Sequence, residues 1–372
     1  MKNFLLDNYL ILMFVLLTTI SFFLSVYTLP VQEHNTVEFM NGFLFLKSVI
    51  IYVISLEILK KSLSSWNENT KIKFNQKDYT NSEMKILSVF SAFPFGLGVT
   101  SFFKGISKNN INTLPISQGL AISILLYPTT PASGYILDFY QIENMYEIFL
   151  YGLPIALLML LSFKNLSMKH LLNTQFLVLI VLMGVVNFIY IEIISIWIKG
   201  HFLIKESFFY ILLSFYINRN IFKDFLPIII NTKGEILFFM GIGTLGNTLI
   251  IWSELNSVSY NEFLLISNLV LIVPIVILPV LSVLLIPPFV LFIIFSPYIT
   301  ELMIINNFSD IAIYSTWMIM LVNAQLISPV SLTTIMAAKN SDNNIFTESV
   351  LKHYKFCIKL SLISFIYLVV IK

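Results

Sequence analysis

Charged residues are scarce in this sequence. Only 11% of the 372 residues are Asp, Glu, Lys or Arg, whereas 57% are hydrophobic and the mean hydropathy is +0.86. A soluble domain usually carries about 25% charged residues, so this chain has too few of them to cover a surface that faces water. The composition therefore excludes a soluble catalytic domain and predicts a protein whose outer surface lies in a lipid bilayer.

The sequence also lacks the residue patterns of catalytic and metal sites. Cys357 is the only cysteine, which excludes an intramolecular disulfide, and no CxxC or Cys/His spacing typical of a metal site occurs. Neither an HExxH pattern, a nucleophile elbow nor a P-loop is present. Basic residues form no patch interleaved with aromatics, so nucleic-acid binding has no support. We therefore predict no enzyme, no metal or other cofactor, and no nucleic-acid partner.

Long apolar segments are abundant instead. A helix needs roughly 20 apolar residues to cross a bilayer, and many segments of this sequence approach or exceed that length. We predict an all-α, polytopic transmembrane protein. Its expected apolar segments are 8–29, 41–59, 84–103, 111–138, 147–163, 171–198, 206–217, 221–231, 234–252, 262–300, 308–338 and 354–371.

The distribution of lysines predicts the orientation of the first segments. The longest polar stretch, Lys60 to Lys85, carries six lysines counting both ends, which places it in the cytoplasm by the positive-inside rule. Two predicted crossings precede it, so the N-terminus is expected to be cytoplasmic as well. The first apolar segment has no small-residue cleavage site after it, and we expect it to remain as a membrane helix.

The apolar pattern is interrupted near the middle of the chain, around Arg219, Lys223 and Lys233. Secondary transporters are often built from two repeats of inverted topology. We therefore predict two transmembrane repeats, residues 1–217 and 218–372.

Helix-breaking residues fall inside four apolar segments. Proline removes a backbone donor and clashes with the preceding turn, and the freed polar groups cannot face lipid. Such interruptions predict discontinuous helices that line a cavity or lie inside the protein. The segments are Ser91–Gly98, Leu126–Gly134, Leu264–Ile299 and Leu326–Thr334.

Two of these interruptions combine proline with hydroxyl side chains, one in each predicted repeat. Opened backbone and hydroxyls can coordinate a small ion, or hold an anion at the N-terminus of a half-helix. The competing interpretation is that the prolines only kink their helices, and that the nearby amides form bonds between helices. The candidate site residues are Thr129, Thr130, Ser133, Gly134, Asn323, Gln325, Ser328, Ser331, Thr333 and Thr334.

These two segments resemble motifs of the ion transporter superfamily, which includes dicarboxylate, citrate, arsenite and sodium/proton carriers. Leu125–Gly134 is similar to a Leu-Leu-Pro-x-Pro-Gly-Gly type motif of a bacterial and archaeal membrane family in that group. Ile327–Leu332 is similar to its Leu-Ser-Pro-x-His-Leu type motif, with Ser331 in the place of the histidine. The resemblance implies inverted repeats, re-entrant hairpins, and a substrate site where hairpin tips meet broken helices.

The function that we predict from the sequence is secondary active transport by alternating access. The solute would be small, an anion or carboxylate, and coupled to Na⁺ or H⁺ across the cytoplasmic membrane. Its other partner is the lipid bilayer, and a homodimer is compatible with the sequence. Two alternatives stay open: a membrane-embedded enzyme acting on lipid-linked sugars or acyl groups, and a non-transporting subunit of a membrane complex.

Overall fold

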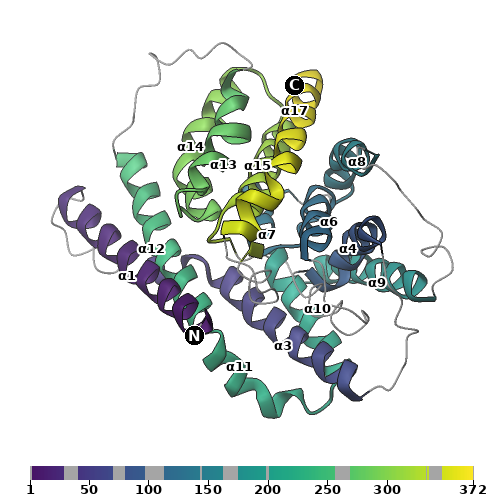
Figure 1. Ribbon diagram of the computed structural model, residues 1–372. Helices are drawn as coiled ribbons and strands as arrows, with labels where there is room; N and C mark the ends of the chain where they lie inside the picture. Colours follow the sequence, from purple (N-terminus) through teal and green to yellow (C-terminus); the bar gives the residue numbers. More distant parts are fainter. Residues whose placement is uncertain are drawn as a thin grey trace.

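All regular secondary structure in the part of the chain that the structure describes is helical (Figure 1). The computed structural model describes residues 2–28, 41–69, 80–96, 113–142, 145–161, 175–197, 201–255, 269–331, 333–334 and 346–371. Its α-helices are α1 (Lys2–Thr28), α3 (Lys47–Asn69), α4 (Asn81–Phe95), α6 (Thr113–Leu126), α7 (Pro131–Phe139), α8 (Met145–Leu161), α9 (Gln175–Trp197), α10 (Phe202–Ile217), α11 (Phe225–Asn231), α12 (Lys233–Leu255), α13 (Leu278–Ser282), α14 (Pro288–Ile305), α15 (Asp310–Ile327) and α17 (Lys352–Ile371). Short 3₁₀ turns, η2 (Ile221–Asp224) and η4 (Leu269–Leu271), and two π-helical turns, η5 (Val273–Ile277) and η6 (Thr347–Leu351), complete it.

Among the described residues, five helical stretches are long and apolar enough to cross a membrane, which confirms the prediction of a helical protein compatible with a bilayer. The longest contains α6 and α7 together, and the others lie in α12, α14, α15 and the η6–α17 unit. The five stretches are Thr113–Phe139, Lys233–Ile251, Pro288–Ile305, Asp310–Ile327 and Thr347–Ile371.

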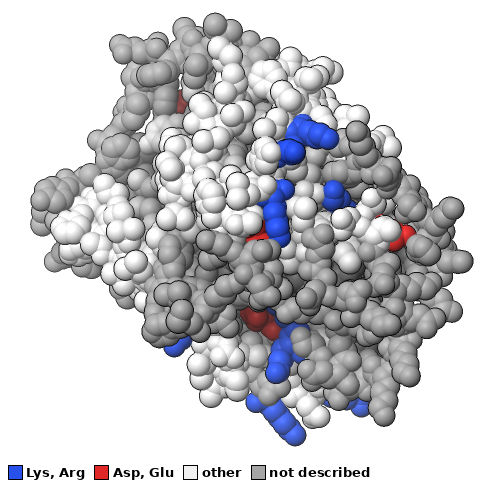
Figure 2. Space-filling view, viewed as in Figure 1, with Lys and Arg blue, Asp and Glu red and all other residues white. Residues whose placement is uncertain are grey.

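Peripheral helices expose apolar stripes, although α17 also exposes Lys355 and Lys359. On α17, every fourth residue of one stripe is an exposed aliphatic side chain: Ile358, Leu362, Ile366 and Val370. Residues four apart lie on one face of a helix, and an exposed apolar stripe of this kind is more stable in contact with lipid than with water. Figure 2 shows a continuous area left of the centre, over α13 and α14, without a charged side chain; Val280 of α13 and Ile304 and Ile305 of α14 are among the exposed aliphatic residues of these helices.

Leu362→Lys is expected to impair membrane integration, because a lysine at the middle of a spanning helix costs about 2.5–3.5 kcal/mol. Tyr354→Lys is the matched control, since it lies one turn from the start of α17, where a lysine side chain can extend to the membrane surface. The measurement is the amount of folded protein in the membrane fraction. Equal yields of the two variants would contradict a lipid-facing stripe on α17.

The two interrupted helices lie at the centre of the molecule. Of the apolar stretch in Thr113–Phe139 that is long enough to cross a membrane, 94% is buried inside the protein. The corresponding share is 83% for α15 and 28% for the η6–α17 unit. The α15 helix packs against α6, α7, α8, α13, α14 and α17. Opened backbone is tolerated at membrane depth only inside protein or beside a cavity, and this central position supplies that shelter.

Each of the four interrupted segments contains a helix end, but the break predicted at Pro297 in the third segment is wrong, because α14 continues through this proline. The 111–138 segment is divided after Leu126, α15 ends at Ile327, and the 262–300 segment is divided between Ser282 and Pro288. The first predicted interruption also ends a helix: α4 stops at Phe95, and Gly96 has φ +49°, a conformation that side-chain-bearing residues rarely adopt.

The two predicted repeats are in contact through several helices. The α10 helix ends at Ile217, where we placed the boundary between them. In sequence terms α1 belongs to the first repeat, yet it lies along α12 of the second (Figure 1). Residues 70–79 of the lysine-rich stretch Lys60–Lys85, which we predict to be cytoplasmic, lie outside the described residues.

Candidate functional site

The first interruption, Tyr127–Thr130 between α6 and α7, has its polar groups paired inside the protein. The hydroxyl of Tyr52 in α3 donates to the Thr129 carbonyl oxygen at 3.2 Å. Thr130 is the N-cap of α7 and forms a reciprocal capping box with Ser133, whose backbone N–H donates to the Thr130 hydroxyl at 3.3 Å. Specific hydrogen bonds therefore hold the conformation of this break.

The second interruption follows α15. Ser328 leaves the helical conformation, and the chain turns back so that the Ser331 hydroxyl donates to the Gln325 carbonyl oxygen at 2.5 Å. The same hydroxyl accepts the backbone N–H of Thr334 at 3.1 Å. Ser331 thus satisfies a carbonyl that the end of α15 leaves without a helical partner, and it also caps the backbone of the helical residue Thr334.

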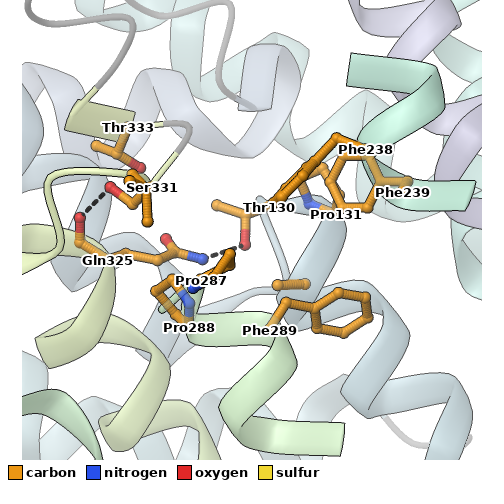
Figure 3. A pocket seen from close by; sticks show the side chains of 12 residues that line it. Thr130, Pro131, Phe238, Phe239, Pro287, Pro288, Phe289, Gln325, Ser331 and Thr333 are labelled. Carbon is orange, nitrogen blue, oxygen red and sulfur yellow. Dashed lines mark hydrogen bonds between the residues drawn. The ribbon is translucent and has the colours of Figure 1, made fainter. Parts of the chain in front are cut away.

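The two interruptions meet at one pocket. The side-chain amide nitrogen of Gln325, in the last turn of α15, lies 3.4 Å from the hydroxyl oxygen of Thr130 (Figure 3). Ser331 and Thr333 line the same pocket, and the third interruption closes it with Pro287 and Pro288. The space between these residues amounts to about 450 Å³ when the open solvent at its mouth is included.

One end of the pocket is polar and the other is aromatic. Figure 3 shows Gln325 and Ser331 on one side of Thr130, and the rings of Phe238, Phe239 and Phe289 on the other. None of the described residues that line the pocket is charged. The arrangement suits a solute with one polar group and a short apolar body.

Gln325 supplies an unpaired hydrogen-bonding group to this pocket. The residue is 9% exposed, and its side-chain oxygen has no hydrogen-bond partner among the described residues. A buried amide oxygen without a partner is costly, so a ligand or a water molecule that pairs with it would be stabilised. Because the Thr130 hydroxyl both donates and accepts, the amide can also turn over and present its NH₂ group.

The N-termini of two helices contribute a positive electrostatic potential to the pocket. The α7 helix begins at Pro131 and α14 begins at Pro288, and both residues line the pocket. A helix N-terminus carries the equivalent of about half a positive charge, and two of them favour an anion over a cation. The carboxyl ends of α6 and α15, which lead into the same two breaks, oppose this contribution.

The ten residues predicted for the site divide into three groups. Thr130, Gln325, Ser331 and Thr333 line the pocket. Thr129, Ser133, Ser328 and Thr334 are buried and lie in the breaks or at the helix starts beside them. Gly134 and Asn323 do not line the pocket.

Packing explains the positions of the last two. A Cβ atom on Gly134 would lie 2.3 Å from the side chain of Leu203, so this glycine brings α7 close to α10. The Asn323 amide donates to the Ile275 carbonyl oxygen at 3.3 Å and to the Ser361 hydroxyl at 3.0 Å. Asn323 therefore joins α15 to η5 and α17, on a different face from Gln325.

The aromatic end of the pocket was not anticipated from the sequence. Pro287 and Pro288 lie in the predicted interruption Leu264–Ile299, which contains none of the ten predicted site residues. Phe238, Phe239 and Phe289 are three of 34 phenylalanines. The only local signal is that Phe289 follows the double proline directly.

Comparisons with known proteins leave the chemistry of this pocket to be argued from its geometry. A scan against protein-family models finds no match, and a search of curated proteins finds none. Within the described residues, no group of three or more His, Cys, Asp or Glu side chains is placed to hold a metal ion.

Proposed function

We propose that this protein is a secondary active transporter of a small organic anion. The observation that carries the proposal is the Gln325–Thr130 contact, which joins interruptions from both halves of the chain at one pocket in the most buried part of the fold. Transporter sites are commonly built at such meeting points of discontinuous helices. The resemblance of Leu125–Gly134 and Ile327–Leu332 to ion transporter motifs supports the same function.

The pocket favours a monocarboxylate with a short apolar body. Two helix N-termini and the amide of Gln325 suit one carboxylate group. Phe238, Phe239 and Phe289 suit the hydrocarbon part. Among the described lining residues there is no cationic side chain and no second polar end that could bind a larger charged solute. The specificity would rest on one carboxylate recognised at one end of the pocket.

Alternating access would use the two halves, 1–217 and 218–372, as inverted repeats that move about this pocket, with re-entrant hairpins at its tips. The breaks would then serve as hinges, because a discontinuous helix bends more easily than a continuous one. The proposed location is the cytoplasmic membrane with the N-terminus in the cytoplasm, and the driving ion is Na⁺ or H⁺.

Binding of the solute can be tested by thermal stabilisation of the purified protein, since a ligand of the folded state raises the unfolding temperature. The probes are sodium 2-oxoisovalerate and sodium benzoate, with isovaleramide as an uncharged control. We expect the two carboxylates to raise the unfolding temperature and the amide to have little effect. In vesicles that contain the protein, uptake of labelled 2-oxoisovalerate is expected to exceed uptake by protein-free vesicles.

Gln325→Ala is expected to weaken binding about tenfold or more, because a hydrogen bond to a charged group contributes about 1.5–3 kcal/mol. Asn323→Ala is the matched control, since this amide lies two residues away in α15 and is bonded outside the pocket. Loss of ligand-induced stabilisation in both variants, or in neither, would contradict the assignment of the pocket. Binding without uptake would leave a solute receptor rather than a transporter.

A further inference from the structure

A second polar cluster lies behind the first interruption, and it contains a buried carboxylate. Glu206 of α10 is 1% exposed. One of its side-chain oxygens accepts the hydroxyl of Tyr127 at 3.1 Å, and the other accepts the amide N–H of Asn187 at 3.0 Å. Acidic residues inside membrane proteins are costly and commonly take part in ion or proton movement.

The surroundings of Glu206 are hydroxyl-rich, and the described residues include no cation paired with it. The titratable side chains that face it are Tyr127 from the break, Tyr52 from α3, Tyr190 from α9 and Tyr210 from its own helix. The neighbouring Lys205 donates instead to the hydroxyl of Ser195 at 2.9 Å. A proton is thus the available cation that could neutralise this carboxylate.

The donors around Glu206 favour a proton over a metal ion. The Asn187 amide N–H groups also donate to the Phe93 carbonyl oxygen at 2.9 Å, which holds the NH₂ group toward the carboxylate. A metal ion needs several oxygen ligands, whereas both carboxylate oxygens here accept N–H or O–H donors. Hydroxyl groups can reverse from donor to acceptor when the carboxylate takes up a proton.

The cluster is connected directly to the break that forms the pocket. Tyr127 is the first residue of that break, and Tyr52, which is bonded to Tyr210 at 3.2 Å, donates to the Thr129 carbonyl oxygen. Hydrogen bonds to a charged group are about twice as strong as those between neutral groups. Neutralising Glu206 would therefore weaken the hold on Tyr127, three residues before the pocket residue Thr130.

We propose that Glu206 is the site that binds and releases the coupling proton, and that its protonation loosens the Tyr127–Thr130 break. This inference rests on the proposed transport function. A proton from water on one side of the membrane forms an O–H bond with the carboxylate, and the same bond breaks when the proton leaves to water on the other side. Movement of one proton with one monocarboxylate transfers no net charge.

Proton binding can be measured without any solute, by infrared difference spectroscopy of the purified protein between alkaline and acidic pH. We expect the wild-type spectrum to contain a C=O band of a protonated carboxyl group that Glu206→Gln lacks. Glu192→Gln is the matched control, because Glu192 lies exposed on the neighbouring helix α9, and this variant should keep the band. Tyr127→Phe should keep the band at a higher frequency, because the C=O group of the protonated Glu206 loses the hydrogen bond from the Tyr127 hydroxyl.

Coupling is tested in vesicles with labelled 2-oxoisovalerate and an imposed pH gradient. Glu206→Gln is expected to retain exchange of labelled for unlabelled solute but to lose accumulation driven by the gradient. A band that persists in Glu206→Gln, or that is removed by added NaCl at constant pH, would overturn the proton site. A Glu206 band in a protein that transports none of the probes would instead contradict the transport function and leave the proton site intact.

Discussion

Gly152→Ala is expected to destabilise the protein by several kcal/mol. A Cβ atom at this position would lie 1.7 Å from the Leu125 carbonyl oxygen and 2.6 Å from the Leu125 carbonyl carbon. These are backbone atoms in the last turn of α6, so no side chain can rotate out of the way. Overpacking typically costs about 1–3 kcal/mol, and here α8 would have to move away from the helix that leads into the first break.

Gly184→Ala is the control that separates this contact from a general effect of losing glycine. Its Cβ would lie 3.5 Å from the nearest atom, the Cβ of Phe93, which is an ordinary contact. Alanine is the better helix former by about 1 kcal/mol, so Gly184→Ala should leave the unfolding temperature unchanged or slightly higher. Tryptophan fluorescence during heating measures both variants, and equal unfolding temperatures would contradict close packing of α8 on α6.

The positions of the helix breaks were predictable, because proline acts locally. A proline inside an apolar run removes one backbone donor wherever the chain goes, and a hydroxyl beside it can pair the freed groups. Both properties can be read from Pro128, Pro131 and Pro329 without knowledge of the fold. That the breaks meet, through Thr130 and Gln325, depends on how α15 crosses α6 and α7, and no local pattern carries that information.

Glu206 shows how a tertiary contact displaced a predicted boundary. The apolar pattern predicts a segment that starts at 206, which puts Glu206 at its edge. In the structure α10 begins at Phe202, because the side chain of Asp138 at the end of α7 accepts the Phe202 N–H at 2.6 Å. This cap comes from a distant part of the chain, and it places Glu206 inside the helix and among buried groups.

The aromatic wall of the pocket was hidden for a different reason. Phe238 and Phe239 lie in α12, which belongs to the second half, and line the pocket beside Pro131 of the first half (Figure 3). In a chain with 34 phenylalanines, a pair of them in an apolar segment is the expected composition of a membrane helix. Only the packing of α12 beside the first break distinguishes this pair from the phenylalanines that face lipid.

Ser331→Ala is expected to have the second large effect on stability. The Ser331 hydroxyl is the hydrogen-bond partner of two buried backbone groups, the Gln325 carbonyl oxygen at 2.5 Å and the Thr334 N–H at 3.1 Å. A buried polar group that loses its partner costs about 1–3 kcal/mol. The Thr334 hydroxyl, at 3.5 Å from the same carbonyl oxygen, offers only a weak replacement, so we expect a loss of about 2–4 kcal/mol.

Ser328→Ala tests whether this loss comes from the hydrogen bonds rather than from the break as a whole. Both serines are buried in the same turn, with exposures of 0% for Ser328 and 2% for Ser331. The Ser328 hydroxyl, however, accepts only a long bond from the Val330 N–H, at 3.4 Å, and its removal should cost less than about 1 kcal/mol. Chemical unfolding of the two variants measures the difference. If Ser328→Ala were as damaging as Ser331→Ala, the second break would depend on tight packing of its turn. The hydrogen bonds of the Ser331 hydroxyl would then not be what holds the end of α15 at the polar side of the pocket.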